Sequence, residues 1–210
     1  MNAQRKSILL LVLLGCAWVC TVALGLIVLF RYETTAGAVG SIGSQWPAGS
    51  KVELASDGLT LVMFAHPQCP CTRASMTELE RIVAHAQGKV RSYVLFYRPG
   101  DGGADWDNTG LRRSAAAIPG VTVLSDIDGT EAHRFGSTTS GHTFLFDENG
   151  RLLFAGGITA TRGHAGDNVG ENAIVSLINS RTSQRDRTLV FGCSLVKRAK
   201  GTEDTKLCLK

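Results

Sequence analysis

Residues 59–74 read Leu59-Thr-Leu-Val-Met-Phe-Ala-His-Pro-Gln-Cys-Pro-Cys-Thr-Arg-Ala74 and join an apolar run to two cysteines. The run Leu59–Ala65 is typical of a central strand that is buried on both faces. A helix is predicted next, over Thr72–Ala86, because apolar residues recur there at three- and four-residue spacing. The residues of this apolar face are Met76, Leu79, Val83 and Ala86. The pattern therefore predicts a buried strand that leads through the cysteines into an amphipathic helix.

The cysteine pair stands where that helix begins. Unpaired amides and the positive end of the helix dipole favour a thiolate at Cys69, and Arg73 adds positive charge. Such positions lower the pKa of a cysteine thiol. A second thiol at Cys71 is placed to attack a mixed disulfide and release the product. A Cys69–Cys71 disulfide closes a small ring around Pro70, so we expect this bond to be strained and labile.

Strands and helices alternate along the rest of the domain. Lys51–Ala55 alternates between apolar and polar residues, and Arg98–Gly110 has the glycines and aspartates of a loop. An Asn-Gly turn at Asn149 and Gly150 indicates a hairpin. The predicted strands are Val90–Tyr97, Val121–Leu124, Thr143–Phe146 and Leu152–Ala155, and the predicted helices are Leu111–Ala117 and Asp167–Ser180. A β-α-β segment followed by a hairpin and a helix predicts an α/β sandwich, with a central mixed sheet flanked by helices.

Three stretches carry a resemblance to a known family. Val121–Gly136 fits a strand, a turn and a short helix, and Thr143–Leu152 fits a closing hairpin. Around the cysteines, eight residues fit the pattern of an apolar strand, Trp-Cys-x-x-Cys and a helix that starts Arg-Ala-x-x-Pro-x-Leu: Phe64, Cys69, Pro70, Arg73, Ala74, Met76, Glu78 and Leu79. Over about residues 51–180 the sequence thus resembles membrane-anchored thioredoxin-like proteins related to cytochrome-maturation reductases. The Cys-Pro-Cys motif with a later Val-Phe-Gly-Cys is similar to a small RedB-like subgroup. The resemblance implies a thioredoxin-like sandwich and thiol–disulfide oxidoreductase activity.

The sequence departs from that family pattern at the site itself. Thr72 takes the position of the second cysteine, so the motif is Cys-x-Cys inside Cys-x-x-Thr. Gln68 replaces the usual tryptophan, and Met63 stands where many thioredoxins have a buried aspartate. The family's cis-Pro-Thr is replaced by His142-Thr143, after Gly141. These departures put ordinary disulfide reductase activity in doubt, and they add Thr72 and His142 to the cysteines as candidate catalytic residues.

Two histidines open an alternative to catalysis. By the resemblance, His142 lies close to Cys69 and Cys71, and His66 is three residues before Cys69. Two thiols and one or two imidazoles suit Cu(I) or Zn(II), so the alternative is a protein that binds or delivers copper or another metal through Cys69, Cys71 and His142, with His66 as a further ligand. His142 is otherwise a proton shuttle for the cysteines or fills the space of the missing proline. His66 otherwise caps its loop.

Two further cysteines follow the domain in a C-terminal extension, residues 181–210. In an exported domain, four cysteines allow three pairings. A structural bridge between Cys193 and Cys208 leaves Cys69 and Cys71 as the working pair. Cys193 is alternatively the resolving partner of Cys69. The sequence leaves both pairings open.

The N-terminal segment has the composition of a membrane anchor. Residues 7–30 contain no charged side chain, and as a helix they rise about 36 Å, enough for a hydrocarbon core of about 30 Å. Arg5 and Lys6 precede the segment and only Arg31 follows closely, so residues 1–6 are predicted to be cytoplasmic and the domain extracytoplasmic or periplasmic. A cleaved signal peptide with Ala36-Gly-Ala38 as its cleavage site is the alternative, and it also exports the domain. Residues 31–50 are rich in small residues and are predicted to be a flexible spacer before a domain over residues 51–180.

Composition and charge narrow the possible partners. The formal net charge is only +4, and the basic residues form no long block interleaved with aromatics, which argues against nucleic acid. The expected partners are membrane lipid around the anchor, exported protein thiols or disulfides, and a membrane or extracytoplasmic electron-transfer partner. No cofactor is predicted for the oxidoreductase. A tethered interaction domain without turnover is the remaining hypothesis.

Overall fold

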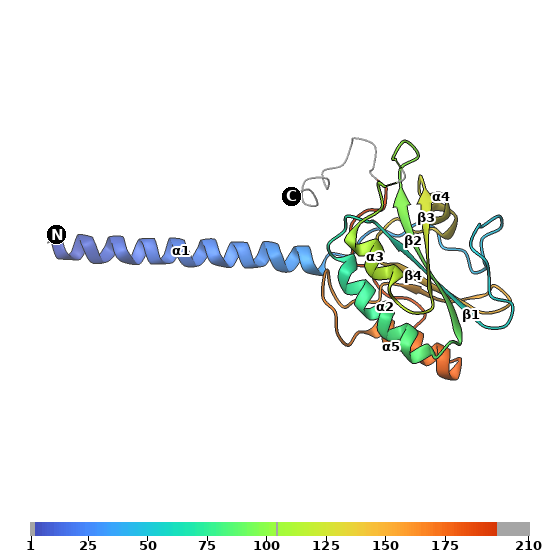
Figure 1. Ribbon diagram of the computed structural model, residues 1–210. Helices are drawn as coiled ribbons and strands as arrows, with labels where there is room; N and C mark the ends of the chain where they lie inside the picture. Colours follow the sequence, from blue (N-terminus) through green and yellow to red (C-terminus); the bar gives the residue numbers. More distant parts are fainter. Residues whose placement is uncertain (1–2, 104, 197–210) are drawn as a thin grey trace. The chain divides into compact units, whose positions relative to one another are not determined.

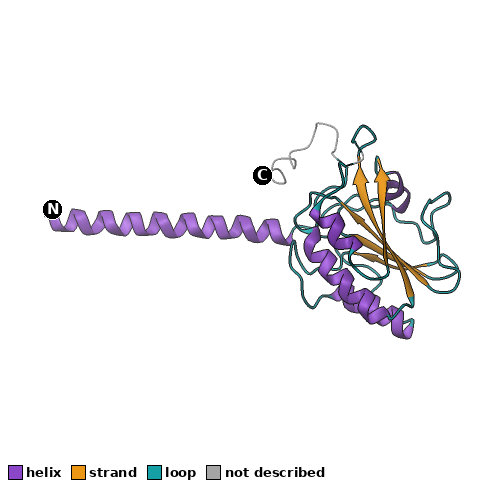
Figure 2. Cartoon of the chain, in the orientation of Figure 1, coloured by secondary structure: helices purple, strands orange, loops and turns teal. Residues whose placement is uncertain are grey.

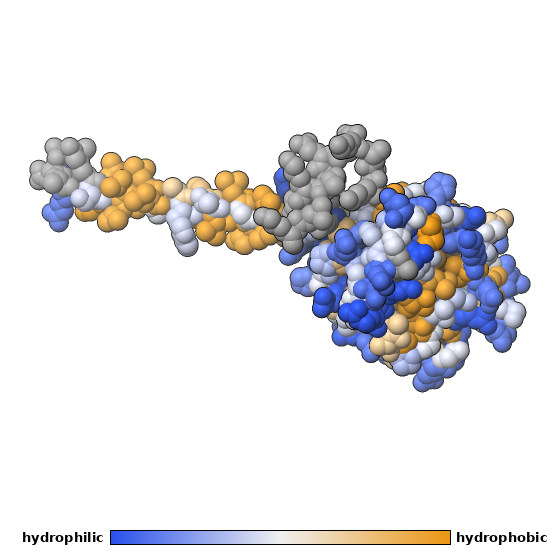
Figure 3. Space-filling model, turned by 45° about the horizontal axis from the view of Figure 1, so that its top comes forward, coloured by the Kyte–Doolittle hydropathy of each residue, from blue (hydrophilic) through white to orange (hydrophobic). Residues whose placement is uncertain are grey.

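The N-terminal helix α1, Ala3–Thr34, forms a compact unit of its own in the computed structural model, which describes residues 3–103 and 105–196. Over Ser7–Thr34 it is long and apolar enough to cross a membrane, judged by length and composition. The same features suit an N-terminal signal sequence. Large apolar side chains such as Leu11, Trp18 and Phe30 are exposed, and Figure 3 shows a largely apolar surface along α1. The helix is therefore a candidate membrane span.

The second unit, from residue 36 onward, is built on one five-stranded sheet (Figures 1 and 2). Its strands lie in the order β3-β2-β1-β4-β5. The pairs β1–β2 and β2–β3 are parallel, whereas β1–β4 and β4–β5 are antiparallel. The strands are β1 Leu59–Ala65, β2 Val90–Arg98, β3 Val121–Ile127, β4 His142–Phe146 and β5 Leu152–Gly156. The predicted mixed sheet is confirmed, and Lys51–Ala55 is not one of its strands.

Helices cover both faces of the sheet. Side chains of α2, α3 and α5 pack in one apolar core, and α4 contributes to the other. The helices are α2 Thr72–Ala86, α3 Gly110–Ala116, α4 Thr130–Phe135 and α5 Val169–Ser180. In the central strand β1, Leu61 and Met63 point into the first core, and Val62 and Phe64 point into the second. A strand buried on both faces has this continuous apolar sequence, because successive side chains alternate between two cores.

Residues 36–50 are part of the folded domain. The Trp46 ring packs edge-on against Phe135 and Phe146, with ring centroids 5.2 and 5.0 Å apart. The Trp46 N–H donates to the carbonyl of Gly150 at 2.7 Å. The prediction of a flexible spacer over residues 31–50 is therefore wrong from residue 36 onward, because these small residues are anchored through backbone hydrogen bonds that leave no periodic signal in a sequence.

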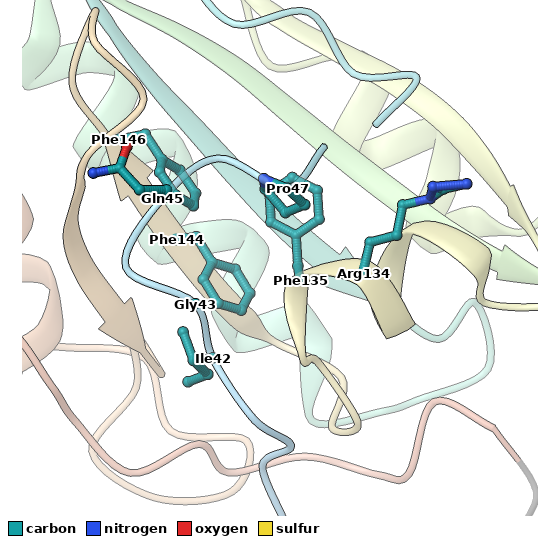
Figure 4. Close-up of a pocket in the computed structure, with 8 residues that line it drawn as sticks. All are labelled: Ile42, Gly43, Gln45, Pro47, Arg134, Phe135, Phe144 and Phe146. Carbon is teal, nitrogen blue, oxygen red and sulfur yellow. The ribbon is translucent and has the colours of Figure 1, made fainter. Parts of the chain in front are cut away.

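A small cavity of about 100 Å³ lies beneath this segment on the α4 side of the sheet. Figure 4 shows the rings of Phe135, Phe144 and Phe146 around it, with Arg134 at its border. Its full lining is Ile42, Gly43, Gln45, Pro47, Arg134, Phe135, Phe144 and Phe146. Cys69 and Cys71 are absent from this lining, so the cavity is separate from the predicted site.

The chain after α5 returns across the edge of the sheet. Arg187 forms an isolated parallel β-bridge with Ala155 in β5. Ser194 forms an isolated antiparallel β-bridge with Thr139, which lies before β4. The Leu195 N–H donates to the Thr138 carbonyl at 2.9 Å. We call residues 186–195 the C-terminal strap. Cys208, the second cysteine of the predicted extension, lies outside the described residues.

Candidate functional site

The site begins at the turn between β1 and α2. The Cys69 N–H donates to the His66 carbonyl at 3.0 Å, and the Thr72 N–H donates to the Cys69 carbonyl at 3.3 Å. Cys71 is the N-cap residue of α2 and has a helical conformation, with φ −65° and ψ −31°. Its own carbonyl accepts from the Ala74 N–H at 3.2 Å. The predicted cysteine pair is thus held at the helix N-terminus, where the helix dipole favours negative charge.

The C-terminal strap brings Cys193 to the same place. Cys69, Cys71 and Cys193 form one buried cluster, with exposed fractions of 3%, 6% and 9%. The Cys193 N–H donates to the Cys69 sulfur at 3.4 Å. These two residues are 124 positions apart in the sequence, so only tertiary structure places them together.

The strap is fixed on both sides of Cys193. The Cys193 carbonyl accepts from the Ser140 N–H at 2.8 Å, and the Gly192 carbonyl accepts from Arg162 Nη1 at 2.6 Å. A side chain at Gly192 would overlap the carbonyl oxygen of Ser140, so glycine is required for this close approach. These contacts hold the Cys193 backbone against the loop before β4.

Several donors converge on the Cys69 sulfur. They are, in order of effect, the Cys193 thiol, the Cys71 thiol, the Thr72 hydroxyl and the Cys193 N–H, and together they hold the pKa of Cys69 far below its usual range. Burial opposes this effect, since it disfavours the charged form, but it is the weaker influence. Cys69 is therefore a thiolate at neutral pH.

The pKa of Cys71, by contrast, is raised above its usual value. Its hydrogen bond with Cys193 lowers its pKa, but the hydrogen bond to Cys69, burial and the negative charge of Cys69 together raise it. At neutral pH the pair thus consists of one thiolate and one thiol that donates to it. Of the two sulfurs, the thiolate is the form that can act as a nucleophile.

A chain of hydroxyls supports the thiolate. Ser140 Oγ accepts from the His66 N–H at 2.8 Å and lies 2.6 Å from Thr72 Oγ1. Since the Thr72 hydroxyl donates to Cys69, the Ser140 hydroxyl is left to donate to Thr72. Both side chains are buried. Thr72, predicted as a site residue from its position in the motif, is thus in direct contact with the nucleophile.

His66 has the capping contact expected of the simpler interpretation. Its Nδ1 accepts from the Gln68 N–H at 3.2 Å. The ring also stacks on Tyr97, with centroids 5.9 Å apart, and meets Trp106 edge-on at 5.8 Å. Tyr97 belongs to β2, and Trp106 lies in the loop that follows it. With His66 they form a cluster of three rings in mutual contact.

His142 lies in an apolar environment. Its side chain is 0% exposed, and its ring lies 4.2 Å from that of Phe144 between centroids. Burial first, and the charge of Arg187 second, lower the pKa of His142 to about 3, so the ring is neutral at physiological pH. Neither ring nitrogen has a hydrogen-bond partner in the part of the chain that is described. A role for His142 at the cysteines stays a prediction.

The copper alternative is likewise left as a prediction. Within residues 3–103 and 105–196, no group of three or more His, Cys, Asp or Glu side chains is arranged to hold a metal ion. His66 and His142 have the ring and loop contacts described above.

Ser140, Cys193 and Arg162 complete the site beyond the residues picked out from the motif. The sequence leaves Cys193 as a possible partner of Cys69, but nothing in its spacing favours that pairing. Ser140 lies two positions before His142, next to the segment that replaces the family's Pro-Thr. This position is the feature of the sequence that could have marked Ser140 as a site residue. Arg162 had no signal in the sequence.

Comparisons with known proteins bear on the fold. No protein-family model matches the chain, and no curated protein sequence matches it. An uncharacterized conserved protein from Geobacillus kaustophilus is similar in structure, with a TM-score of 0.57 and 17% identity, over 80% of this chain and 94% of its own. A hypothetical protein from Sinorhizobium meliloti has a TM-score of 0.55 and 18% identity, over 80% of this chain and 97% of its own. The exposed lipoprotein thioredoxin of Streptococcus pneumoniae has a TM-score of 0.44 and 17% identity, over 59% of this chain and 84% of its own.

The sheet order with antiparallel β4 and β5, and cysteines between β1 and α2, match the arrangement implied by the resemblance. The chain has a thioredoxin-like fold. This confirms the predicted sandwich with an N-terminal candidate membrane span.

Proposed function

We propose that the protein is a membrane-tethered, extracytoplasmic thiol–disulfide oxidoreductase in which Cys69 is the nucleophile. The observation that carries this proposal is the set of donors from Cys193, Cys71 and Thr72 around one buried sulfur. A purely structural thiol has no need of so many donors, whereas a nucleophile does, because the thiolate is the reactive species.

The chemistry follows from the protonation states. The Cys69 thiolate attacks one sulfur of a substrate disulfide, the substrate S–S bond breaks, and the other substrate sulfur leaves as a thiolate. The product is a mixed disulfide on Cys69, which a second thiol of the site then resolves. Run in reverse, the same steps transfer a disulfide to a substrate.

The location and partners belong to the same proposal. Arg5 and Lys6 lie before the apolar segment and Arg31 lies after it, which favours a cytoplasmic N-terminus and an exported domain. Exported protein thiols or disulfides are then the substrates, and an electron-transfer partner in or outside the membrane resets the site. The resemblance to cytochrome-maturation reductases and to the RedB-like subgroup supports this assignment.

The test is the pH dependence of Cys69 alkylation. The full chain in detergent micelles, with Cys16 and Cys20 replaced by alanine, is treated with iodoacetamide between pH 5 and 9, and each cysteine is quantified by mass spectrometry. The expected rate at Cys69 is nearly constant over this range, because the thiolate fraction is already near one. The slope with pH is the readout, since burial slows the absolute rate. A rate at Cys69 that falls about tenfold per pH unit below pH 8, as for an ordinary thiol, contradicts the proposal.

A second readout separates nucleophilic attack from later steps. With bis(2-hydroxyethyl) disulfide, Cys69→Ser is expected to form no mixed disulfide at the site, while Cys193→Ser still forms one on Cys69. Unchanged mixed-disulfide formation at the site in Cys69→Ser would refute the assignment of Cys69.

A further inference from the structure

We propose that Cys193 is the resolving cysteine, so that the mixed disulfide on Cys69 is released by closure of a Cys69–Cys193 disulfide; this rests on the proposed function. The active site is then a centre of three cysteines, two from the β1–α2 turn and one from the C-terminal strap, in place of a local Cys-Pro-Cys pair.

Cys193 already contacts the Cys69 sulfur. Among the groups around the Cys69 sulfur, Cys193 has the largest effect, and it approaches through both its thiol and its N–H, the latter at 3.4 Å. Its thiol also hydrogen-bonds with Cys71. A thiol within hydrogen-bonding reach of the sulfur it must attack needs only a small movement to react.

The strap presents Cys193 on a rigid backbone. Hydrogen bonds on both sides of the residue, from Ser140 N–H to its carbonyl and from Arg162 to the Gly192 carbonyl, fix the peptide groups that carry it. The bridge between Thr139 and Ser194 continues this anchoring on the C-terminal side. Since the backbone is already ordered, ring closure with Cys69 requires little further loss of conformational entropy.

Ring size favours Cys193 over Cys71. A Cys69–Cys71 bond closes a ring of three residues around Pro70, with Cys71 already held in a helical conformation at the start of α2. A Cys69–Cys193 bond joins residues 124 positions apart and therefore constrains the unfolded chain far more. Of the two products, the long-range disulfide avoids the strained three-residue ring, and Cys71 remains a thiol that hydrogen-bonds with the site.

The step balances within the protein and its substrate. The Cys193 thiolate attacks the Cys69 sulfur of the mixed disulfide, and the bond between Cys69 and the substrate sulfur breaks. The substrate leaves as a thiolate and takes up the proton that Cys193 gave up. Overall, the Cys69 thiolate and the Cys193 thiol are oxidised to a disulfide, and the substrate disulfide is reduced to one thiol and one thiolate, which takes a proton from water.

The experiment follows the mixed disulfide by acid-quenched mass spectrometry. The reduced full chain in micelles, with Cys16 and Cys20 replaced by alanine, reacts with bis(2-hydroxyethyl) disulfide. Cys193→Ser is expected to trap the adduct on Cys69 and to slow its resolution at least tenfold. Cys71→Ser is expected to resolve within a few-fold of the parent rate, and Cys208→Ser, the matched control, at the parent rate.

The parent protein provides a measurement that does not depend on how the variants fold. After oxidation with one equivalent of the same reagent, peptide mapping is expected to find Cys69 joined to Cys193. Rapid resolution in Cys193→Ser with trapping in Cys71→Ser, or a parent product that joins Cys69 to Cys71 or Cys193 to Cys208, overturns the inference. If Cys69→Ser still forms the site adduct, the proposed function itself fails, and this result is distinct from the others.

Discussion

Two buried carboxyl groups join α2 to α5 and give a quantitative test of the structure. Glu78 on α2 is 0% exposed and accepts from the Gly166 N–H at 2.7 Å. Glu171, in the first turn of α5, is 8% exposed and hydrogen-bonds to Glu78. Burial first, and then this hydrogen bond and the charge of Glu78, raise the pKa of Glu171 from 4.5 to about 7. Below that pH, the Glu171 carboxyl keeps its proton and donates it to Glu78.

The sign of the pH effect follows from this raised pKa. The folded state binds the Glu171 proton more tightly than the unfolded chain does, so its stabilising effect is fully present below pH 4.5 and is lost as the pH rises through about 7. The gap of about 2.5 pH units, at about 1.4 kcal/mol per unit, corresponds to at most about 3.5 kcal/mol of unfolding free energy. Glu171→Gln replaces the proton donor with an amide that does not titrate, so this loss of stability between pH 5 and 8 is expected to disappear.

The assay is urea unfolding of the full chain in micelles at pH 5, 6, 7 and 8, followed by tryptophan fluorescence. Glu80→Gln is the matched control, because Glu80 lies on α2, two residues after Glu78, and its side chain is exposed. The difference between Glu171→Gln and the parent is expected to grow by about 2–3 kcal/mol in favour of the variant from pH 5 to pH 8. A Glu171→Gln variant whose stability changes with pH as the parent's does would refute the shared proton.

Three other substitutions test the site and its support. Ser140→Ala removes the hydroxyl between Thr72 and the His66 amide and is expected to raise the pKa of Cys69, read from the fall of the alkylation rate when the profile is extended below pH 5; an unchanged profile in that acid range would contradict the hydroxyl chain. Trp46→Ala should lower the unfolding free energy by about 2–3 kcal/mol if residues 36–50 are folded, and by almost nothing if they form a spacer. Gly192→Ala should lower the free energy of unfolding by about 1–3 kcal/mol and slow formation of the Cys69–Cys193 disulfide. An unchanged rate of disulfide formation would contradict a role for the strap in positioning Cys193.

Local patterns predicted the central elements well. The apolar run Leu59–Ala65 is β1, the spaced apolar residues of Thr72–Ala86 form the buried face of α2, and the Asn-Gly turn connects β4 to β5. Each of these signals comes from residues within a few positions of one another. The cysteines at the start of α2 were found for the same reason, since a helix N-terminus is a local feature.

The segments at both ends of the domain were harder to predict. Residues 36–50 and the C-terminal strap have neither helical nor strand periodicity, and much of their attachment to the sheet is through backbone hydrogen bonds. Every residue except proline carries these backbone groups, so their pairing leaves no mark on the sequence. The shared proton of Glu78 and Glu171 is hidden for a similar reason, because it depends on how α2 packs against α5.

The strand, the amphipathic helix, the apolar N-terminal segment and the cysteine pair before the helix can all be predicted from the sequence, because periodicity and helix polarity act over a few residues. The groups that surround Cys69 depend instead on tertiary packing. Cys193, 124 positions away, donates to the Cys69 sulfur, and Ser140, 71 positions away, hydrogen-bonds with Thr72, which also donates to that sulfur. Together these donors outweigh burial, which disfavours the charged thiolate. The chemistry of the site therefore depends on long-range packing that places several donors around one sulfur.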